Sequence, residues 1–227
     1  MQARDRLVVA VDRSSRDDIL RTVDALAGAV GTFKLGLQAF IANGPDIVRD
    51  VVGRGEKVFL DLKIHDIPNT ARHAVAEAAA LGASMITVHA AGGAAMLEGC
   101  AAAAGGALVL GVTILTSLDQ EALLGIGFSG TPEANAVRLA TLAKESGLRG
   151  VVASPHEIAA IRAACGDGFV ILTPGIRPSG ADRGDQRRTM TPRQAVQAGA
   201  DYLVVGRPVT DAPDARAAAM AIVEEMS

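Results

Sequence analysis

Three charged side chains crowd residues 58–70, VFLDLKIHDIPNT, at the end of an apolar run. In an extended strand alternate side chains lie on the same side, so Asp61 and Lys63 are predicted to be neighbours on one face. A carboxylate and an ammonium at the end of a buried strand are costly to desolvate unless they are paired or serve a site. Asp66 follows where the strand should become a loop, and Pro68 suits the first turn of a helix. A structural ion pair is the simpler explanation, but the crowding of charge favours a functional site.

The composition limits the class of protein. The chain has 227 residues, 49% hydrophobic but only 3% aromatic, so its core must be built from Ala, Val, Leu and Ile. The net charge of −3 argues against a nucleic-acid groove as the main function. No apolar run is long enough to span a membrane, and the first residues lack the layout of a signal peptide. Cys100 and Cys165 have no metal-ligand spacing, so we expect two free thiols in a cytoplasmic protein.

A strand-then-helix repeat occurs eight times. The strands read as continuous Val, Leu and Ile runs, which is typical of strands covered on both faces, and are predicted at 7–12, 32–37, 57–64, 85–90, 107–114, 150–154, 169–176 and 202–208. Helices are predicted at 16–29, 38–52, 69–81, 93–104, 133–145, 155–164, 192–198 and 214–226, with cap signals at Ser154 and Thr191. The repeat predicts an α/β fold, a single (β/α)8 TIM barrel over residues 1–227. A doubly wound open sheet is the alternative, but no GxGxxG turn follows the first strand.

Polar residues gather where the predicted strands end, the place where barrels carry their sites. They are Asp12, Lys34, Asp61 with Lys63, His89, Thr116 with Ser117, Arg177, and Gly206 with Arg207. Some have an ordinary explanation when taken singly, since His89 fits a hydrogen-bonded core residue and Asp12 a helix N-cap. Their convergence on one mouth indicates a binding site.

Two segments interrupt the repeat. Residues 177–190, RPSGADRGDQRRTM, follow the seventh predicted strand, and loops after strands seven and eight recurrently bind phosphate in barrels. Gly206 allows close approach of the backbone and Arg207 offers a forked cation, a pair suited to a phosphate. A solvated flexible loop is the alternative for 177–190. Residues 125–132 are expected to form a turn between two helical pieces.

These motifs together resemble the orotidine 5'-monophosphate decarboxylase family, which makes UMP in pyrimidine biosynthesis. The resemblance rests on DLKIHDIPNT and continues through AVD at 10–12, FKLG at 33–36, VHA at 88–90, VTILTS at 112–117, TPGIRP at 173–178, DQRR at 185–188 and VVGRP at 204–208. It implies decarboxylation of orotidine monophosphate to UMP with neither a metal nor an organic cofactor.

The resemblance also implies residue roles. Lys63 is expected to protonate C6 of the pyrimidine as carbon dioxide leaves, with Asp61 beside the substrate carboxylate. Lys34 is expected to hold Asp61 and the ribose hydroxyls, and Asp66 to complete a Lys-Asp-Lys-Asp network.

Other roles concern the rest of the nucleotide and a second chain. Asp12 is expected at the ribose and Thr116 at the pyrimidine edge. The phosphate is expected to meet Gln186, Arg207, Gly206 and Arg177. A homodimer is implied in which Asp66 and Thr70 serve the partner's site, with no nucleic-acid or membrane partner.

Two rival functions remain. A sugar-phosphate decarboxylase or hexulose-phosphate synthase of the same barrel group also shows the D-x-K-x-x-D pattern, but uses Mg²⁺ held partly by a Glu where this chain has Lys34. A cation at that position should repel Mg²⁺, which needs carboxylate oxygens. The second rival is a non-catalytic nucleotide-binding barrel. Retention of Asp61, Lys63 and Asp66 argues against it, because phosphate binding needs none of them.

Overall fold

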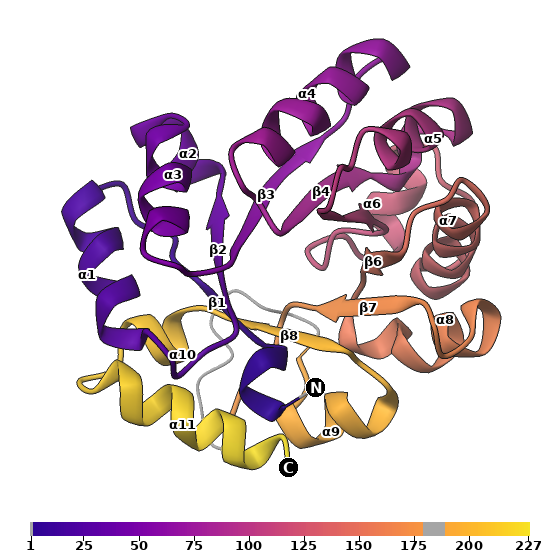
Figure 1. Cartoon of the computed structure of the whole chain (residues 1–227). Helices are drawn as coiled ribbons and strands as arrows, with labels where there is room; N and C mark the ends of the chain where they lie inside the picture. The colour runs from indigo at the N-terminus through magenta and orange to yellow at the C-terminus, as the bar shows by residue number, and fades with distance from the viewer. Residues whose placement is uncertain (1, 179–188) are drawn as a thin grey trace.

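Eight parallel strands close into a barrel in the computed structural model, which describes residues 2–178 and 189–227. Each strand is hydrogen-bonded to its neighbours in sequence, and β8 returns to β1 (Figure 1). The strands are β1 (Leu7–Ala10), β2 (Thr32–Gly36), β3 (Val58–Ile64), β4 (Met85–His89), β5 (Leu108–Val112), β6 (Gly150–Val152), β7 (Val170–Thr173) and β8 (Tyr202–Val205). The predicted α/β fold with a (β/α)8 barrel is therefore confirmed.

Helices surround the strands (Figure 1). The α-helices are α1 (Arg16–Leu26), α2 (Leu37–Asn43), α3 (Asp46–Gly53), α4 (Pro68–Ala80), α5 (Ala94–Ala102), α6 (Gln120–Gly125), α7 (Pro132–Glu145), α8 (Ile158–Cys165), α9 (Pro192–Ala198), α10 (Arg207–Thr210) and α11 (Ala215–Glu225). Short 3-10 helices are η1 (Ala3–Arg6), η2 (Ala90–Gly92) and η3 (Pro155–Glu157). Thr191 caps α9 through a reciprocal pair with Gln194, as its position before Pro192 predicted. The turn expected around 125–132 is also confirmed, because it joins α6 to α7.

The single helix predicted at 38–52 is wrong, because α2 and α3 are separate. Gly44 has a φ of 66°, in the left-handed region that glycine adopts readily. Pro45 then caps α3, where its missing N–H has no cost. The apolar period continues across this break, which is why the pattern suggested one helix.

Several predicted strands also extend too far. β1 ends at Ala10 instead of Asp12, β7 ends at Thr173, and β8 ends at Val205 before the chain turns into α10. After β1 and β7 the apolar pattern continues past the last ladder position, because Val11 and Ile176 are buried in the outer core layer. As a result Asp12, Arg177 and Arg207 lie on loops or helix starts beyond their strands.

The core has two layers, because side chains on a strand alternate between the barrel interior and the helices. The interior layer consists of Val8, Ala10, Phe59, Met85, Leu110, Leu172 and Val204, and the larger outer layer packs strands against helices. Phe59 is 1% exposed and Leu172 is fully buried. The interior layer fills the middle of the barrel, and a cavity opens at the end toward which the strands run.

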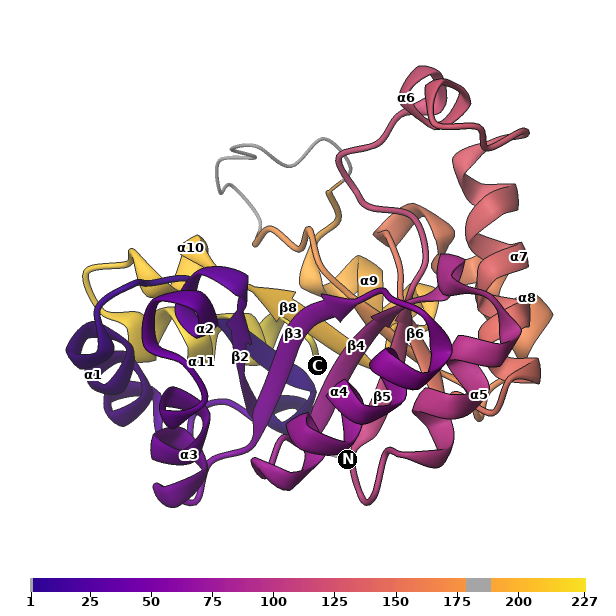
Figure 2. The same ribbon diagram turned by 90° about the horizontal axis from the view of Figure 1, so that it is seen from above.

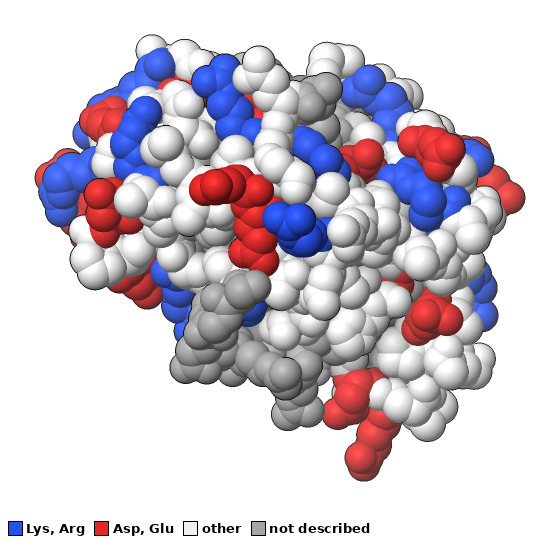
Figure 3. Space-filling view, turned by 90° about the horizontal axis from the view of Figure 1, so that it is seen from below, with Lys and Arg blue, Asp and Glu red and all other residues white. Residues whose placement is uncertain are grey.

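One helix projects from the barrel. Figure 2 shows α6 and the segment leading to it standing above the rest of the barrel. The two termini lie close together (Figures 1 and 2), since η1 packs against α11. On the face in Figure 3, acidic and basic side chains are interspersed among uncharged areas. Within residues 2–178 and 189–227, no helix is both long and apolar enough to cross a membrane.

The two cysteines should be unreactive in the folded protein. Both are free and buried, and burial raises the pKa of the Cys100 thiol to about 11 and also raises that of Cys165. Because the thiolate is the reactive form, we expect negligible reaction with Ellman's reagent at pH 8. The same protein in guanidinium should release two equivalents of chromophore, from its two cysteines. Rapid stoichiometric labelling before unfolding would contradict this burial.

Candidate active site

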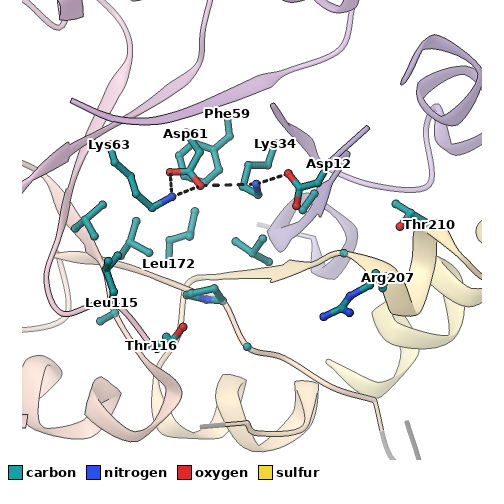
Figure 4. Close-up of a pocket in the computed structure, with 18 of the residues that line it drawn as sticks. Asp12, Lys34, Phe59, Asp61, Lys63, Leu115, Thr116, Leu172, Arg207 and Thr210 are labelled. Carbon is teal, nitrogen blue, oxygen red and sulfur yellow. Dashed lines mark hydrogen bonds and ion pairs between the residues drawn. The ribbon is translucent and has the colours of Figure 1, made fainter. Parts of the chain in front are cut away.

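A row of alternating charges lies at the ends of β1, β2 and β3 (Figure 4). Lys63 Nζ is 3.0 Å from both oxygens of Asp61. Lys34 Nζ is 3.7 Å from Asp61 Oδ2 and 3.0 Å from Asp12 Oδ1. The side chains of Lys34 and Asp61 are only 12% and 13% exposed, so each of these inner charges requires its partners.

Gly36 provides the space for one of these pairs. A Cβ at this position would lie 3.0 Å from Lys34 Nζ and 3.1 Å from Asp12 Oδ1. Any larger residue would therefore press on both members of the Lys34–Asp12 pair. The FKLG motif therefore has a glycine at this position for a steric reason: a side chain would collide with the Lys34–Asp12 pair.

The backbone of Lys63 is unusual. Its φ is 52°, and among the described residues no other non-glycine residue has a positive φ. The β3–β4 register also shifts between Leu60 and Ile64, which marks a bulge at this point. Such a conformation costs about 1–3 kcal/mol and persists only where the surroundings enforce it.

Thr87 of β4 belongs to this arrangement and was missed in the sequence. Its buried hydroxyl donates to Asp61 Oδ1 at 2.9 Å and accepts the backbone N–H of Lys63 at 2.9 Å. The available signal was a hydroxyl residue inside the apolar run MITVH, at a position whose side chain points into the barrel. That signal is weak, since Thr is common in strands.

The charged row forms one wall of a cavity of about 470 Å³. Its floor is apolar and includes Phe59 and Leu172 of the interior core layer. The predicted site residues that line it are Asp12, Lys34, Asp61, Lys63, Thr116, Arg177, Gly206 and Arg207. Figure 4 shows Arg207 across the cavity from Lys63 and Asp61. The volume and the few convergent polar groups suit a small organic ligand.

The far side of the cavity is basic. Arg207 begins α10 directly after Gly206, and Arg177 Nη1 donates to the carbonyl of Ile176 at 3.0 Å. Arg13 also lines the cavity and is bound to Asp211 Oδ1 at 2.6 Å. The guanidinium groups of Arg177 and Arg207 and the backbone of Gly206 line one cavity and can accommodate an anionic group.

Two predicted site residues that the structure describes, Asp66 and Thr70, do not line this cavity. Asp66 and Thr70 are exposed, and Asp66 Oδ1 accepts the N–H of Ile67 at 2.7 Å. Gln186 lies in 179–188, outside the described residues, as does most of the segment 177–190. One chain therefore brings together Lys34, Asp61 and Lys63 of the predicted network, with Asp12 next to Lys34 in place of Asp66.

His89 is also at a strand end but does not line the cavity. Its ring lies 5.2 Å from that of His65, measured between centroids. Burial lowers the pKa of His89, and His65 and Lys63 lower it further. This burial favours the neutral form of His89.

Comparison with known proteins identifies the family. Residues 5–222 match the model of the orotidine 5'-phosphate decarboxylase / HUMPS family. The chain is 51% identical to an orotidine 5'-phosphate decarboxylase of Moorella thermoacetica, covering 100% of this chain and 94% of that one. It is 52% identical to that of Anaeromyxobacter sp. (strain K), with 98% of each chain covered. A crystal structure of the Lactobacillus acidophilus enzyme of the same name superposes with a TM-score of 0.88 at 34% identity, covering 97% of this chain and 98% of that one. The chain therefore belongs to the orotidine 5'-phosphate decarboxylase / HUMPS family.

Proposed function

We propose that this chain decarboxylates orotidine 5'-monophosphate to UMP, with Lys63 as the proton donor to C6. The chain is a carboxy-lyase of pyrimidine biosynthesis, as relatives half identical to it over its full length indicate. The observation that supports the residue roles is the Lys63 ammonium, held 3.0 Å from both oxygens of Asp61 in a cavity that Thr116 and Arg207 also line.

The charged row suits this chemistry. Loss of carbon dioxide leaves a carbanion at C6, and an ammonium placed there stabilises the developing charge and then donates a proton. Asp61 keeps the ammonium oriented before substrate arrives. Lys34, 3.7 Å from Asp61 Oδ2, is a second cation beside the same carboxylate. Little reorganisation is then needed when charge develops, which is the source of electrostatic catalysis.

The basic end of the cavity is assigned to the phosphate. Arg207 is its main anchor, with Gly206 and Arg177 beside it and Gln186 added from the segment outside the described residues. Asp12 and Lys34 are placed at the ribose and Thr116 at the pyrimidine edge. Binding energy from a remote phosphate can then be used to position the reacting ring.

The magnesium-dependent rival holds its Mg²⁺ partly through a Glu at the position where this chain has Lys34. The family description covers both kinds of enzyme, so family membership alone does not separate them. Lys34 Nζ lies between Asp12 and Asp61, at 3.0 and 3.7 Å, and already supplies the positive charge that these carboxylates require. A divalent ion would have to share the same oxygens with an ammonium. The decarboxylase is therefore favoured, and a mere nucleotide-binding barrel would have no use for the Lys63–Asp61 pair.

We further infer that the site is completed in a homodimer. Asp66 and Thr70 are exposed, and they flank Ile67, which is 69% exposed. At the end of the adjacent strand β2, Leu37 and Ile41 are 49% and 78% exposed. An apolar surface next to two predicted site residues fits a second copy that takes Asp66 and Thr70 into its own cavity. We also propose that residues 1–227 form a single domain and that the protein is cytoplasmic.

Replacing Lys63 by Ala should lower turnover of orotidine monophosphate by roughly 10²–10⁴-fold or more, because the proton donor is lost. The fold should survive, since Asp61 keeps Thr87 at 2.9 Å and Lys34 at 3.7 Å. Lys57→Ala is the matched control, because this exposed lysine sits just before the opposite end of the same strand. Turnover is followed by ultraviolet absorbance, and folding by circular dichroism and melting. Near-normal turnover by a folded Lys63→Ala protein would contradict the role of Lys63 as proton donor.

Replacing Arg207 by Ala should weaken UMP binding roughly 10- to 100-fold while changing uridine binding little, because charge-assisted hydrogen bonds to the phosphate are lost. Arg207→Lys should recover only part of the loss, since an ammonium lacks the planar fork. Thr116→Ala should instead weaken both ligands by a similar factor. Calorimetric titration of UMP and uridine distinguishes the cases. Equal losses for both ligands in Arg207→Ala would remove Arg207 as the phosphate anchor.

Mixing inactive mutants tests the shared site. Homodimers of Lys63→Ala and of Asp66→Ala should each be nearly inactive. If Asp66 acts in the partner's site, a heterodimer has one site with both lesions and one with neither. Random pairing makes about half of the dimers mixed, so about a quarter of wild-type activity should return.

The structure supplies a control for this mixing experiment. Lys34 and Lys63 lie in one chain's cavity, so heterodimers of Lys34→Ala and Lys63→Ala carry one lesion in every site and should show no recovery. Mass spectrometry of differently tagged chains confirms that subunits exchanged. With exchange confirmed, absence of recovery for Asp66→Ala with Lys63→Ala places Asp66 in its own subunit's site.

A further inference from the structure

We propose that Thr87 is a positioning residue for decarboxylation, which holds the backbone of Lys63 and the carboxylate of Asp61 through one hydroxyl. The inference rests on the proposed role of Lys63. It concerns a side chain that is fully buried in β4 and is not among the residues lining the cavity. Thr87 therefore acts through other residues and has no contact with the reacting atoms.

The strand register explains why a single residue has this position. On β3 the ladder partners are Leu60 and then Ile64, and on β4 they are Ile86 and then Val88. Three residues of β3, from Asp61 to Lys63, thus lie opposite Thr87 alone. In a regular ladder a backbone carbonyl would pair with the N–H of Lys63. Here the Thr87 hydroxyl accepts that N–H at 2.9 Å.

The hydroxyl is the side-chain group suited to this task. It accepts from the Lys63 N–H and at the same time donates to Asp61 Oδ1, at 2.9 Å in each case. A methyl group of the same size does neither. A carboxylate would accept the N–H but would repel Asp61. The two bonds fix the Lys63 backbone at its positive φ and orient the carboxylate that receives the Lys63 ammonium.

This arrangement constrains both ends of the Lys63 side chain. Asp61 holds the ammonium, Thr87 holds the main chain, and Thr87 and Asp61 are themselves bonded. The ammonium is then restricted to a small volume above the cavity floor. A displacement of about 1 Å at a reacting group can cost roughly 100-fold in rate, so loss of the hydroxyl should appear in kcat.

Two matched pairs isolate the hydroxyl. Thr and Val at position 87 differ by hydroxyl against methyl, and Thr87→Ser and Thr87→Ala differ only by the hydroxyl. Thr87→Val and Thr87→Ala should lower kcat roughly 10- to 100-fold, with KM and the dissociation constant of UMP within about threefold of wild type. Thr87→Ser should keep kcat within about threefold. If Thr87→Val does not fold, the Ser and Ala proteins still make the comparison.

A buried threonine elsewhere in the barrel controls for general loss of packing. Thr113 is 4% exposed, and its hydroxyl donates to the carbonyl of Val152 at 3.0 Å. Thr113→Val loses a similar buried hydrogen bond without touching Lys63 or Asp61, and should keep kcat. Hydrogen exchange of peptides covering 60–66 adds a structural readout. The Lys63 amide should exchange faster in Thr87→Val and Thr87→Ala than in Thr87→Ser.

The outcomes separate this inference from the proposed function. If Lys63→Ala is inactive while Thr87→Val and Thr87→Ser have equal kcat, the role of Thr87 is wrong and that of Lys63 stands. Equal losses of kcat in Thr87→Val and Thr113→Val also overturn the inference, since a general packing defect then explains both. If Lys63→Ala keeps its activity, the proposed role of Lys63 is wrong, and the inference about Thr87, which rests on it, is wrong as well.

Discussion

The site depends on one carboxylate that is almost removed from water. The Asp61 side chain is 13% exposed, so its charge is tolerated only with close partners. It has the Lys63 ammonium at 3.0 Å, the Lys34 ammonium at 3.7 Å and the Thr87 hydroxyl at 2.9 Å. Each partner has a structural consequence: Lys63 adopts a φ of 52°, and Lys34 with Asp12 needs the space left by the missing side chain of Gly36. The positive φ of Lys63 in β3 and the glycine at the end of β2 thus both lie beside this buried charge.

The barrel lets one strand serve both stability and chemistry. Along β3, Phe59, Asp61 and Lys63 point to the same interior, so the residue that closes the core is followed directly by the charged pair. The apolar floor excludes water beneath the ammonium and strengthens its interaction with Asp61. Because alternate residues of a β-strand lie on one face, the core residue Phe59 and the charged pair are held side by side.

The same period explains what could be predicted from the sequence. It places Asp61 and Lys63 on one face, and the repeated apolar runs indicate eight parallel strands, both of which the structure confirms. The positive φ of Lys63 and the role of Thr87 could not be predicted, because both depend on how β4 lies against a bulge in β3. The break at Gly44 was missed, since the apolar pattern continues across it. For Asp66 and Thr70 the difficulty is different: a single chain leaves both exposed and away from the cavity, so their shared role stays a prediction.

The charged row and the arginines that line the cavity have different predicted tasks in binding and in chemistry. Asp12, Lys34, Asp61 and Lys63 contain two positive and two negative groups, so the row is neutral as a whole. Attraction of an anionic nucleotide must therefore come mainly from other residues that line the cavity, such as Arg177 and Arg207. An unpaired Lys63 would bind the substrate carboxylate strongly in the ground state and gain nothing for the rate. In the proposed mechanism Asp61 holds Lys63, so the ammonium interacts strongly only with negative charge that develops beside it during the reaction. The pairing that makes the buried carboxylate tolerable would then also direct the ammonium toward the transition state.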